Sequence, residues 1–144
     1  AVDLGAPLLR GEGDAVSITA DCLTPQQCHN LALSILQATR LRFSKTEYIA
    51  CPSCGRTLFD LQSTLRDIKA ATSHLKHLKI GVLGCIVNDP GEMADADYGY
   101  VGASAGHITL YKGKTPVEKN ISQEEAIPRL IELLKREGQW VEPK

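Results

Sequence analysis

Two cysteines in one tight turn, Cys51 and Cys54, constrain this chain more than any other feature. The preceding residues 47–50 predict a short strand. Apolar residues then recur at helical spacing, which predicts a helix over about 57–71 whose first turn directs N–H groups toward the sulfurs. Two thiolates at this spacing can bind one metal centre, as in many iron–sulfur and zinc sites. The turn therefore predicts a metal site, with a redox dithiol or two buried thiols as the open alternatives.

A third cysteine, Cys85, lies at the end of the apolar segment 79–87, which predicts a strand buried on both faces. A cysteine where such a strand meets a loop can face another loop at the same sheet edge, although a buried core cysteine is the alternative. Glu92 follows a Pro-Gly turn and can supply an oxygen ligand to an iron that lacks a thiolate. Such a ligand exchanges more readily than sulfur, so that a substrate oxygen can displace it.

The cysteine count and the charge exclude several classes of protein. The chain has five cysteines, an odd number, and no secretory signal, which favours a reducing compartment (cytoplasm, or a plastid stroma) over a disulfide framework. Cys28 falls inside the first predicted helix and Cys22 just before it, and both are expected to have structural or incidental roles. The net charge of −1 gives no excess of positive charge of the kind that binds nucleic acid. The longest apolar run, of about 8 residues, is far shorter than a membrane span of about 20.

The remaining elements are predicted from caps, alternation and turn residues. Residues 15–20 predict a strand, and Thr24, Pro25 and Gln27 start a helix that runs to about Arg40. Later strands are predicted over 98–101, 108–112 and 116–120, with a turn at 113–114. A second capping box, Ser122 with Glu125, starts a helix that Gly138 ends.

Together these elements predict an α+β fold, in which helices pack on a mixed β-sheet over residues 44–144, after a βα unit over residues 1–43. The chain starts at Ala1 without a methionine and has a glycine-rich stretch near its start. We therefore expect a fragment cut from inside a larger protein.

A zinc site is the main alternative to iron and sulfur. Cys51, Cys54, His74 and His77 would form a Cys₂His₂ set and stabilise an interaction domain. However, the two histidines are closer in sequence than is usual for zinc. They also fall in residues 73–79, which are predicted as the polar end of a helix.

Three longer motifs carry a family resemblance: EYIACPSCGRTLFDL at 47–61, GCIVN at 84–88 and PGEMADADYGYVG at 90–102. The chain resembles the C-terminal part of the 4-hydroxy-3-methylbut-2-enyl diphosphate synthases, iron–sulfur oxidoreductases of the methylerythritol phosphate route of isoprenoid and terpenoid biosynthesis. The resemblance is dense over 47–144 and loose over 1–46.

The resemblance implies a [4Fe–4S] cluster held by Cys51, Cys54, Cys85 and Glu92. Glu92 and Asn88 are then the catalytic candidates, Asn88 as a substrate contact. The implied substrate is 2-C-methyl-D-erythritol 2,4-cyclodiphosphate, whose ring is opened with loss of water by two electrons and two protons. Ferredoxin or flavodoxin is the implied electron donor, and neither nucleic acid nor a membrane is a partner. A pure electron-transfer module is the alternative, which a set of four cysteine ligands would favour.

The resemblance also implies the domain organisation. Residues 44–144 correspond to a cluster-binding domain that resembles a half-domain of sulfite and nitrite reductases. Residues 1–43 correspond to the last βα unit of a truncated TIM barrel. The missing barrel, in the same chain or another subunit, would hold the diphosphate, so the fragment alone is expected to be inactive.

Two residues depart from the family pattern. Asp89 replaces a common glycine and would add negative charge beside the cluster, and Ala15 replaces a common barrel arginine. Arg56 is expected to be a solvated or capping residue, and Asp95 and Asp97 are expected to structure their loop.

Overall fold

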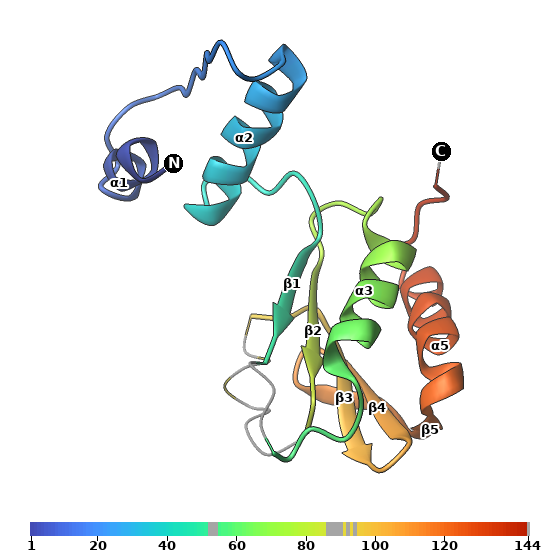
Figure 1. Ribbon diagram of the computed structural model, residues 1–144. Helices are drawn as coiled ribbons and strands as arrows, with labels where there is room; N and C mark the ends of the chain where they lie inside the picture. Colours follow the sequence, from blue (N-terminus) through green and yellow to red (C-terminus); the bar gives the residue numbers. More distant parts are fainter. Residues whose placement is uncertain (52–54, 86–90, 92, 94, 144) are drawn as a thin grey trace. The chain divides into compact units, whose positions relative to one another are not determined.

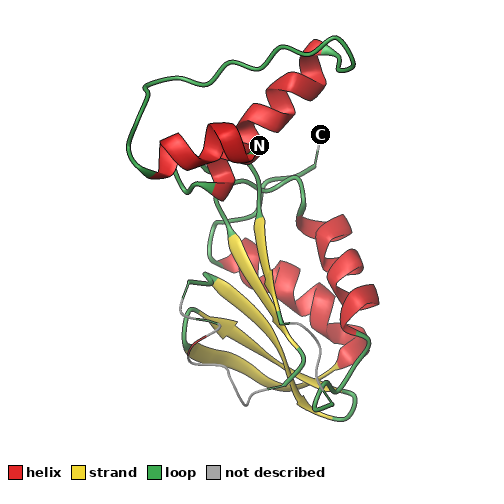
Figure 2. Cartoon of the chain, turned by 60° about the vertical axis from the view of Figure 1, so that its left-hand side comes forward, coloured by secondary structure: helices red, strands yellow, loops and turns green. Residues whose placement is uncertain are grey.

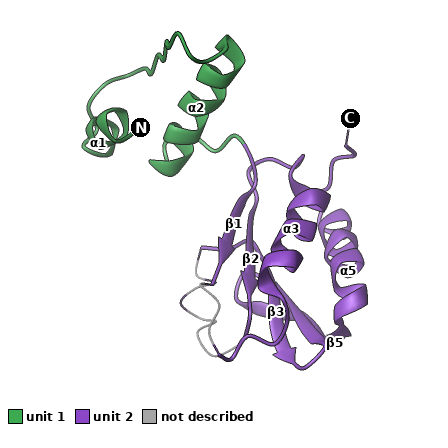
Figure 3. Cartoon of the chain, in the orientation of Figure 1, with its two compact units in different colours: residues 1–44 green, residues 45–144 purple. Residues whose placement is uncertain are grey.

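The computed structural model describes residues 1–51, 55–85, 91, 93 and 95–143, which are drawn in Figures 1 and 2. These residues form two compact units, residues 1–44 and residues 45–144, which Figure 3 shows in separate colours. In the described parts of both units, no helix has the length and apolar character that crossing a membrane requires.

The first unit consists of helix α1, Val2–Leu9, helix α2, Pro25–Ala38, and the segments around them. The helices are packed together, since a Cβ added at Gly5 would lie 3.7 Å from the Thr39 side chain. The predicted capping box of α2 is confirmed. The Gln27 N–H donates to Thr24 Oγ1 at 3.3 Å, and the Thr24 N–H donates to Gln27 Oε1 at 2.8 Å.

Two features of the first unit differ from the sequence prediction. Residues 15–20, predicted as a strand, lie in no strand. A strand needs a neighbour for its backbone hydrogen bonds, and the sheet that the structure describes is built from residues of the second unit only. Helix α1 was not predicted, because Gly5 and Pro7 both lower the helix propensity of this segment.

The second unit is a five-stranded sheet in the order β1-β2-β3-β4-β5. Its strands are Glu47–Ala50, Lys79–Leu83, Tyr98–Ser104, His107–Lys112 and Thr115–Ser122. Strands β1, β2 and β3 run parallel, whereas β4 and β5 pair antiparallel. Helices α3, Leu61–Thr72, and α5, Gln123–Arg136, cover one face of the sheet (Figure 2). The predicted mixed sheet and α+β class are confirmed.

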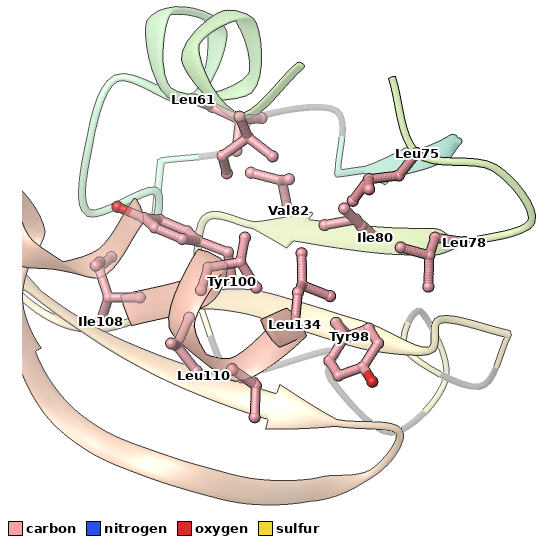
Figure 4. Packing of buried hydrophobic residues seen from close by; sticks show 14 residues of the cluster. Leu61, Leu75, Leu78, Ile80, Val82, Tyr98, Tyr100, Ile108, Leu110 and Leu134 are labelled. Atoms are coloured by element: carbon pink, nitrogen blue, oxygen red, sulfur yellow. The ribbon is translucent and has the colours of Figure 1, made fainter. Parts of the chain in front are cut away.

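The main core lies between this sheet face and the two helices (Figure 4). Val82 of β2, Tyr100 of β3 and Leu134 of α5 are fully buried there. Phe59 meets Tyr100 edge to face, with 5.5 Å between the ring centroids. The burial of β2 on both faces was predicted from its continuous apolar sequence, and it is confirmed by a second cluster on the other side.

That second cluster is centred on Met93, which is 2% exposed. Met93 sits over two glycines that pair across β2 and β3, Gly81 and Gly99. A Cβ at Gly81 would lie 2.5 Å from Met93 Sδ, and one at Gly99 would lie 2.3 Å from Met93 Cε. Only residues without a side chain leave room for this methionine.

The helix ends of the second unit correct two predictions. Helix α3 begins at Leu61 rather than Thr57, because the Asp60 carboxylate accepts the N–H groups of Gln62 and Ser63 and caps the helix there.

Helix α5 begins after Ser122, but the predicted capping box is wrong. The Ser122 hydroxyl donates to the Glu125 carboxylate at 3.3 Å and accepts no backbone N–H. Gly138 ends α5 as predicted, with a φ of 70°. The N–H groups of Gly138 and Gln139 donate to the carbonyl oxygens of Lys135 and Leu134, as in a Schellman motif.

Candidate functional site

The predicted site lies at the edge of the sheet where the parallel strands end. Cys51 follows β1 directly, and Gly84 and Cys85 follow β2. Because β1 and β2 are parallel neighbours, with Ala50 paired to Val82, their carboxyl ends meet at this edge. The topology therefore brings Cys51 next to the segment that carries Cys85.

The sulfur of Cys51 accepts a hydrogen bond across this edge. The Gly84 N–H donates to Cys51 Sγ at 3.2 Å, and the Cys51 N–H donates to the Val82 carbonyl at 3.4 Å. Cys51 is partly buried and packs against both hydrophobic clusters. A backbone N–H aimed at a cysteine sulfur stabilises negative charge on it, which is the form that binds metals. The geometry thus suits a thiolate ligand.

Gly84 is enclosed on three sides, a feature that the sequence analysis missed. The Leu58 N–H donates to the Gly84 carbonyl at 3.1 Å. A Cβ at Gly84 would lie 2.7 Å from Thr57 Cγ2, and a Cβ at Gly102 would lie 2.4 Å from the Gly84 carbonyl oxygen. We call Thr57, Leu58, Gly84 and Gly102 the glycine clamp. Its signal in the sequence is a glycine at the end of a buried strand, which often marks close backbone approach.

The structure describes two of the four predicted cluster ligands. Cys51 and Cys85 are partly buried free thiols. Cys54 and Glu92 lie outside the described residues, and so do Asn88 and Asp89. Their predicted roles stay predictions. Among the residues that are described, His, Cys, Asp and Glu side chains form no group of three or more that could hold a metal ion.

The other two cysteines belong to the first unit. Cys28 is buried in α2, and Cys22 is exposed before that helix.

The sequence predicted that N–H groups from the start of the helix face the cysteines. The N–H group that faces Cys51 does not come from that helix. Because α3 begins at Leu61, its first free N–H groups, those of Gln62 and Ser63, donate to Asp60. These bonds, that of Ser63 foremost, lower the pKa of the Asp60 carboxyl. The donor to the sulfur is the backbone of Gly84 instead.

The zinc alternative is contradicted by the positions of its histidines. Thr46 Oγ1, just before β1, donates to the carbonyls of Thr72 and Leu75, so His74 lies at the amino end of β1. Cys51 lies at the other end of this strand, and a four-residue strand spans about 13 Å. His74 is also engaged elsewhere, since its Nε2 lies 2.8 Å from the Val141 carbonyl oxygen. The Cys₂His₂ set is therefore not brought together.

Asp97 has the structural role that was expected. Its carboxylate accepts the Lys79 N–H at 2.8 Å, and its own N–H donates to the Lys79 carbonyl at 2.8 Å. These bonds join the start of β2 to the start of β3, at the edge opposite to Cys51. Asp95 and Arg56 are exposed.

Comparison with known proteins gives consistent matches. The sequence model of the family described as GcpE protein C-terminal domain matches residues 47–136. The chain is 63% identical over 140 residues to the 4-hydroxy-3-methylbut-2-en-1-yl diphosphate synthase (flavodoxin) of Porphyromonas gingivalis, covering 97% of this chain and 24% of that protein. For the proteins of the same name from Parabacteroides distasonis and Chlorobaculum tepidum, the identities are 60% and 51%, covering 98% and 99% of this chain and 23% and 19% of those proteins. The chain thus spans about a quarter or less of these relatives' length.

Proposed function

This chain belongs to the family of the GcpE protein C-terminal domain, and on that premise we propose that it is the cluster-binding part of a 4-hydroxy-3-methylbut-2-en-1-yl diphosphate synthase. The observation that carries the proposal is the sulfur of Cys51, which accepts the Gly84 N–H one residue before Cys85. Two cysteines that follow neighbouring parallel strands at the same end of the sheet, with a backbone donor on one sulfur, fit an iron–sulfur group.

In this proposal the thiolates of Cys51, Cys54 and Cys85 hold three irons of a [4Fe–4S] cluster, and the Glu92 carboxylate holds the fourth. When bound, the cluster supplies the electrons, and its iron without a thiolate polarises a substrate oxygen. Cys51 lies between the two apolar clusters, so the packing around it keeps water from one side of the site. Asn88, three residues after Cys85 in the sequence, is proposed to orient the substrate.

The proposed reaction is that of the whole enzyme. Two electrons and two protons open the ring of 2-C-methyl-D-erythritol 2,4-cyclodiphosphate and release water. The name of the relatives includes flavodoxin, and we propose flavodoxin as the electron donor here. A TIM barrel, of which residues 1–43 are proposed to be the last βα unit, would grip the diphosphate, and residues 15–20 would form its last strand only when paired with a neighbouring strand of that barrel. The chain by itself is then expected to bind the cluster without turning over substrate.

Anaerobic reconstitution tests the proposal. The chain is expected to bind about four irons and as many sulfides. Cys85→Ser should lower the iron content and change the visible spectrum, because a ligand to the cluster is lost. Cys22→Ser is the matched control, since Cys22 is exposed in the first unit and its loss should leave the iron content unchanged. Fewer than about three irons per wild-type chain, or an unchanged spectrum in Cys85→Ser, would contradict the proposal.

A further inference from the structure

The hydrogen bond to the Cys51 sulfur depends on two glycines, Gly84 and Gly102, which have no reactive side chain. We propose that Gly102 positions the Gly84 N–H on the Cys51 sulfur, and that this bond raises the reduction potential of the cluster. The inference rests on the proposed function above. It makes Gly102 a positioning residue, which acts on the cluster through the backbone of Gly84.

The donor to the Cys51 sulfur is a backbone N–H from the neighbouring strand's end. The Gly84 N–H lies 3.2 Å from Cys51 Sγ, and the two residues are brought together only by the pairing of β1 with β2. Reduction adds negative charge to a cluster and its sulfur ligands. A donor on one sulfur therefore stabilises the reduced state more than the oxidised state, and the potential rises.

The orientation of Gly84 is fixed by Thr57 and Leu58. Its carbonyl accepts the Leu58 N–H at 3.1 Å, and its Cα faces the Thr57 side chain so closely that a Cβ would lie 2.7 Å from Thr57 Cγ2. The N–H and the carbonyl of Gly84 are thus fixed by different partners, Cys51 and Leu58, which lie on either side of residues 52–54 in the sequence.

Gly102 lies against the Gly84 carbonyl. A Cβ there would lie 2.4 Å from the Gly84 carbonyl oxygen and 3.3 Å from the Phe59 ring. The nearest obstacle is backbone, which cannot swing aside as a long side chain can. The Phe59 ring in turn meets the fully buried Tyr100 ring edge to face. A methyl group at position 102 must therefore displace the Gly84 carbonyl and, through the Cα that the carbonyl and the N–H of Gly84 share, shift the donor on the sulfur.

The decisive comparison is the reduction potential of the reconstituted chain and its Gly102→Ala variant, measured by redox titration followed by electron paramagnetic resonance. The variant is expected to bind iron as the wild type does, with a reduction equilibrium about tenfold less favourable, which is about 59 mV for one electron. Gly113→Ala is the matched control. Gly113 has a φ of 55° in the turn between β4 and β5 with open space around it, so alanine there strains the fold away from the site.

The outcomes separate this inference from the proposed function. A wild-type chain that binds no iron overturns both. Equal iron contents with equal potentials in wild type and Gly102→Ala overturn the inference alone. A shift of the same size in Gly113→Ala also overturns it, because the potential would then follow general strain.

A measurement without iron covers the case in which Gly102→Ala fails to fold. In the metal-free chain, Cys51→Ala removes the acceptor, and the Gly84 amide is expected to exchange its hydrogen at least fivefold faster. The Leu58 amide, which donates to the Gly84 carbonyl, serves as the internal reference and should keep its rate. Equal exchange of the Gly84 amide in both chains overturns the inference.

Discussion

At the scale of single residues, the Tyr100 hydroxyl is poorly matched to its surroundings. Tyr100 is fully buried on β3, and among the described residues its oxygen has no hydrogen-bond partner. Burial raises its pKa to about 12. A buried polar group without a partner costs about 1–3 kcal/mol of stability, because its bond to water is lost and not replaced.

Tyr100→Phe is therefore expected to raise the free energy of unfolding by about 1 kcal/mol, measured by urea denaturation. Tyr48→Phe is the matched comparison, since the Tyr48 hydroxyl lies 2.8 Å from Thr72 Oγ1 and forms a hydrogen bond. Its removal should lower the free energy of unfolding by about 1 kcal/mol. The expectation is wrong if Tyr100→Phe destabilises the fold as much as Tyr48→Phe does.

The same tyrosine predicts a pH dependence. Its pKa is 10.0 in the unfolded chain and about 12 in the folded one. Below pH 10 the hydroxyl is protonated in both states. Between pH 10 and 12 the unfolded chain releases a proton that the folded chain retains, so the free energy of unfolding falls as the pH rises. Urea titrations across this range should show a shallower fall for Tyr100→Phe, and parallel curves would contradict the assignment.

At this scale the sequence identified the cysteines but not their environment. Cys51 and Cys85 were predicted as partners because each follows a strand. The bond from Gly84 to Cys51 depends on the register of β1 and β2, which spacing along the chain does not specify. The clamp residue Gly102 comes from a third strand, so its role is visible only after the sheet has formed.

At the scale of secondary-structure elements, two helix starts with similar sequences behave differently. Thr24 accepts the Gln27 N–H, whereas the Ser122 hydroxyl donates to Glu125. Thr24→Ala should therefore cost about 1 kcal/mol locally, and Ser122→Ala only a few tenths. In hydrogen exchange, the Gln27 amide should speed up about fivefold in the first variant. The Glu125 amide should stay near its wild-type rate in the second, and equal effects would contradict this difference.

Strand β3 allows a second test at this scale, because the missing side chain of its Gly99 leaves the space that the Met93 side chain occupies. Gly99→Ala should lower the free energy of unfolding by about 1–3 kcal/mol, since the new methyl group overlaps the methionine. In a Met93→Ala background the same change should cost less. A double-mutant cycle by urea denaturation measures this coupling, and strictly additive losses would show that the two residues do not compete for one space.

The existence and order of the elements in the second unit followed from alternation, caps and turn residues, whereas several boundaries did not. Helix α3 starts later than its apolar periodicity suggests, because Asp60 competes as a cap. Residues 15–20 have strand-like residues but no partner strand in the described structure. A local sequence pattern predicts a helix or strand well where the elements that pair or pack with it lie nearby in the same chain.

At the scale of the whole chain, the two compact units predict a proteolysis pattern. The segment between them exposes Arg40 and Arg42, so limited trypsin treatment should cut there first. The product that contains residues 45–144 has its own core and should stay folded. It also carries all four proposed ligands, and after reconstitution it should bind as much iron as the intact chain. Rapid loss of this product, or of its iron binding, would contradict the independence of the second unit.

The mixed sheet also has a consequence for the order in which the chain folds. Strands β3, β4 and β5 are joined by short turns. Strands β1 and β2 are instead separated by a long segment that contains α3, so that Glu47 pairs with the distant Lys79. Closing a long loop costs more entropy than closing a turn, so the hairpins should form early and the parallel pair late. The edge that carries Cys51 and Cys85 is then among the last parts to assemble. Iron delivered during synthesis would reach these two thiols while they are still far from each other. Efficient cluster insertion should therefore occur only after the parallel strands have paired.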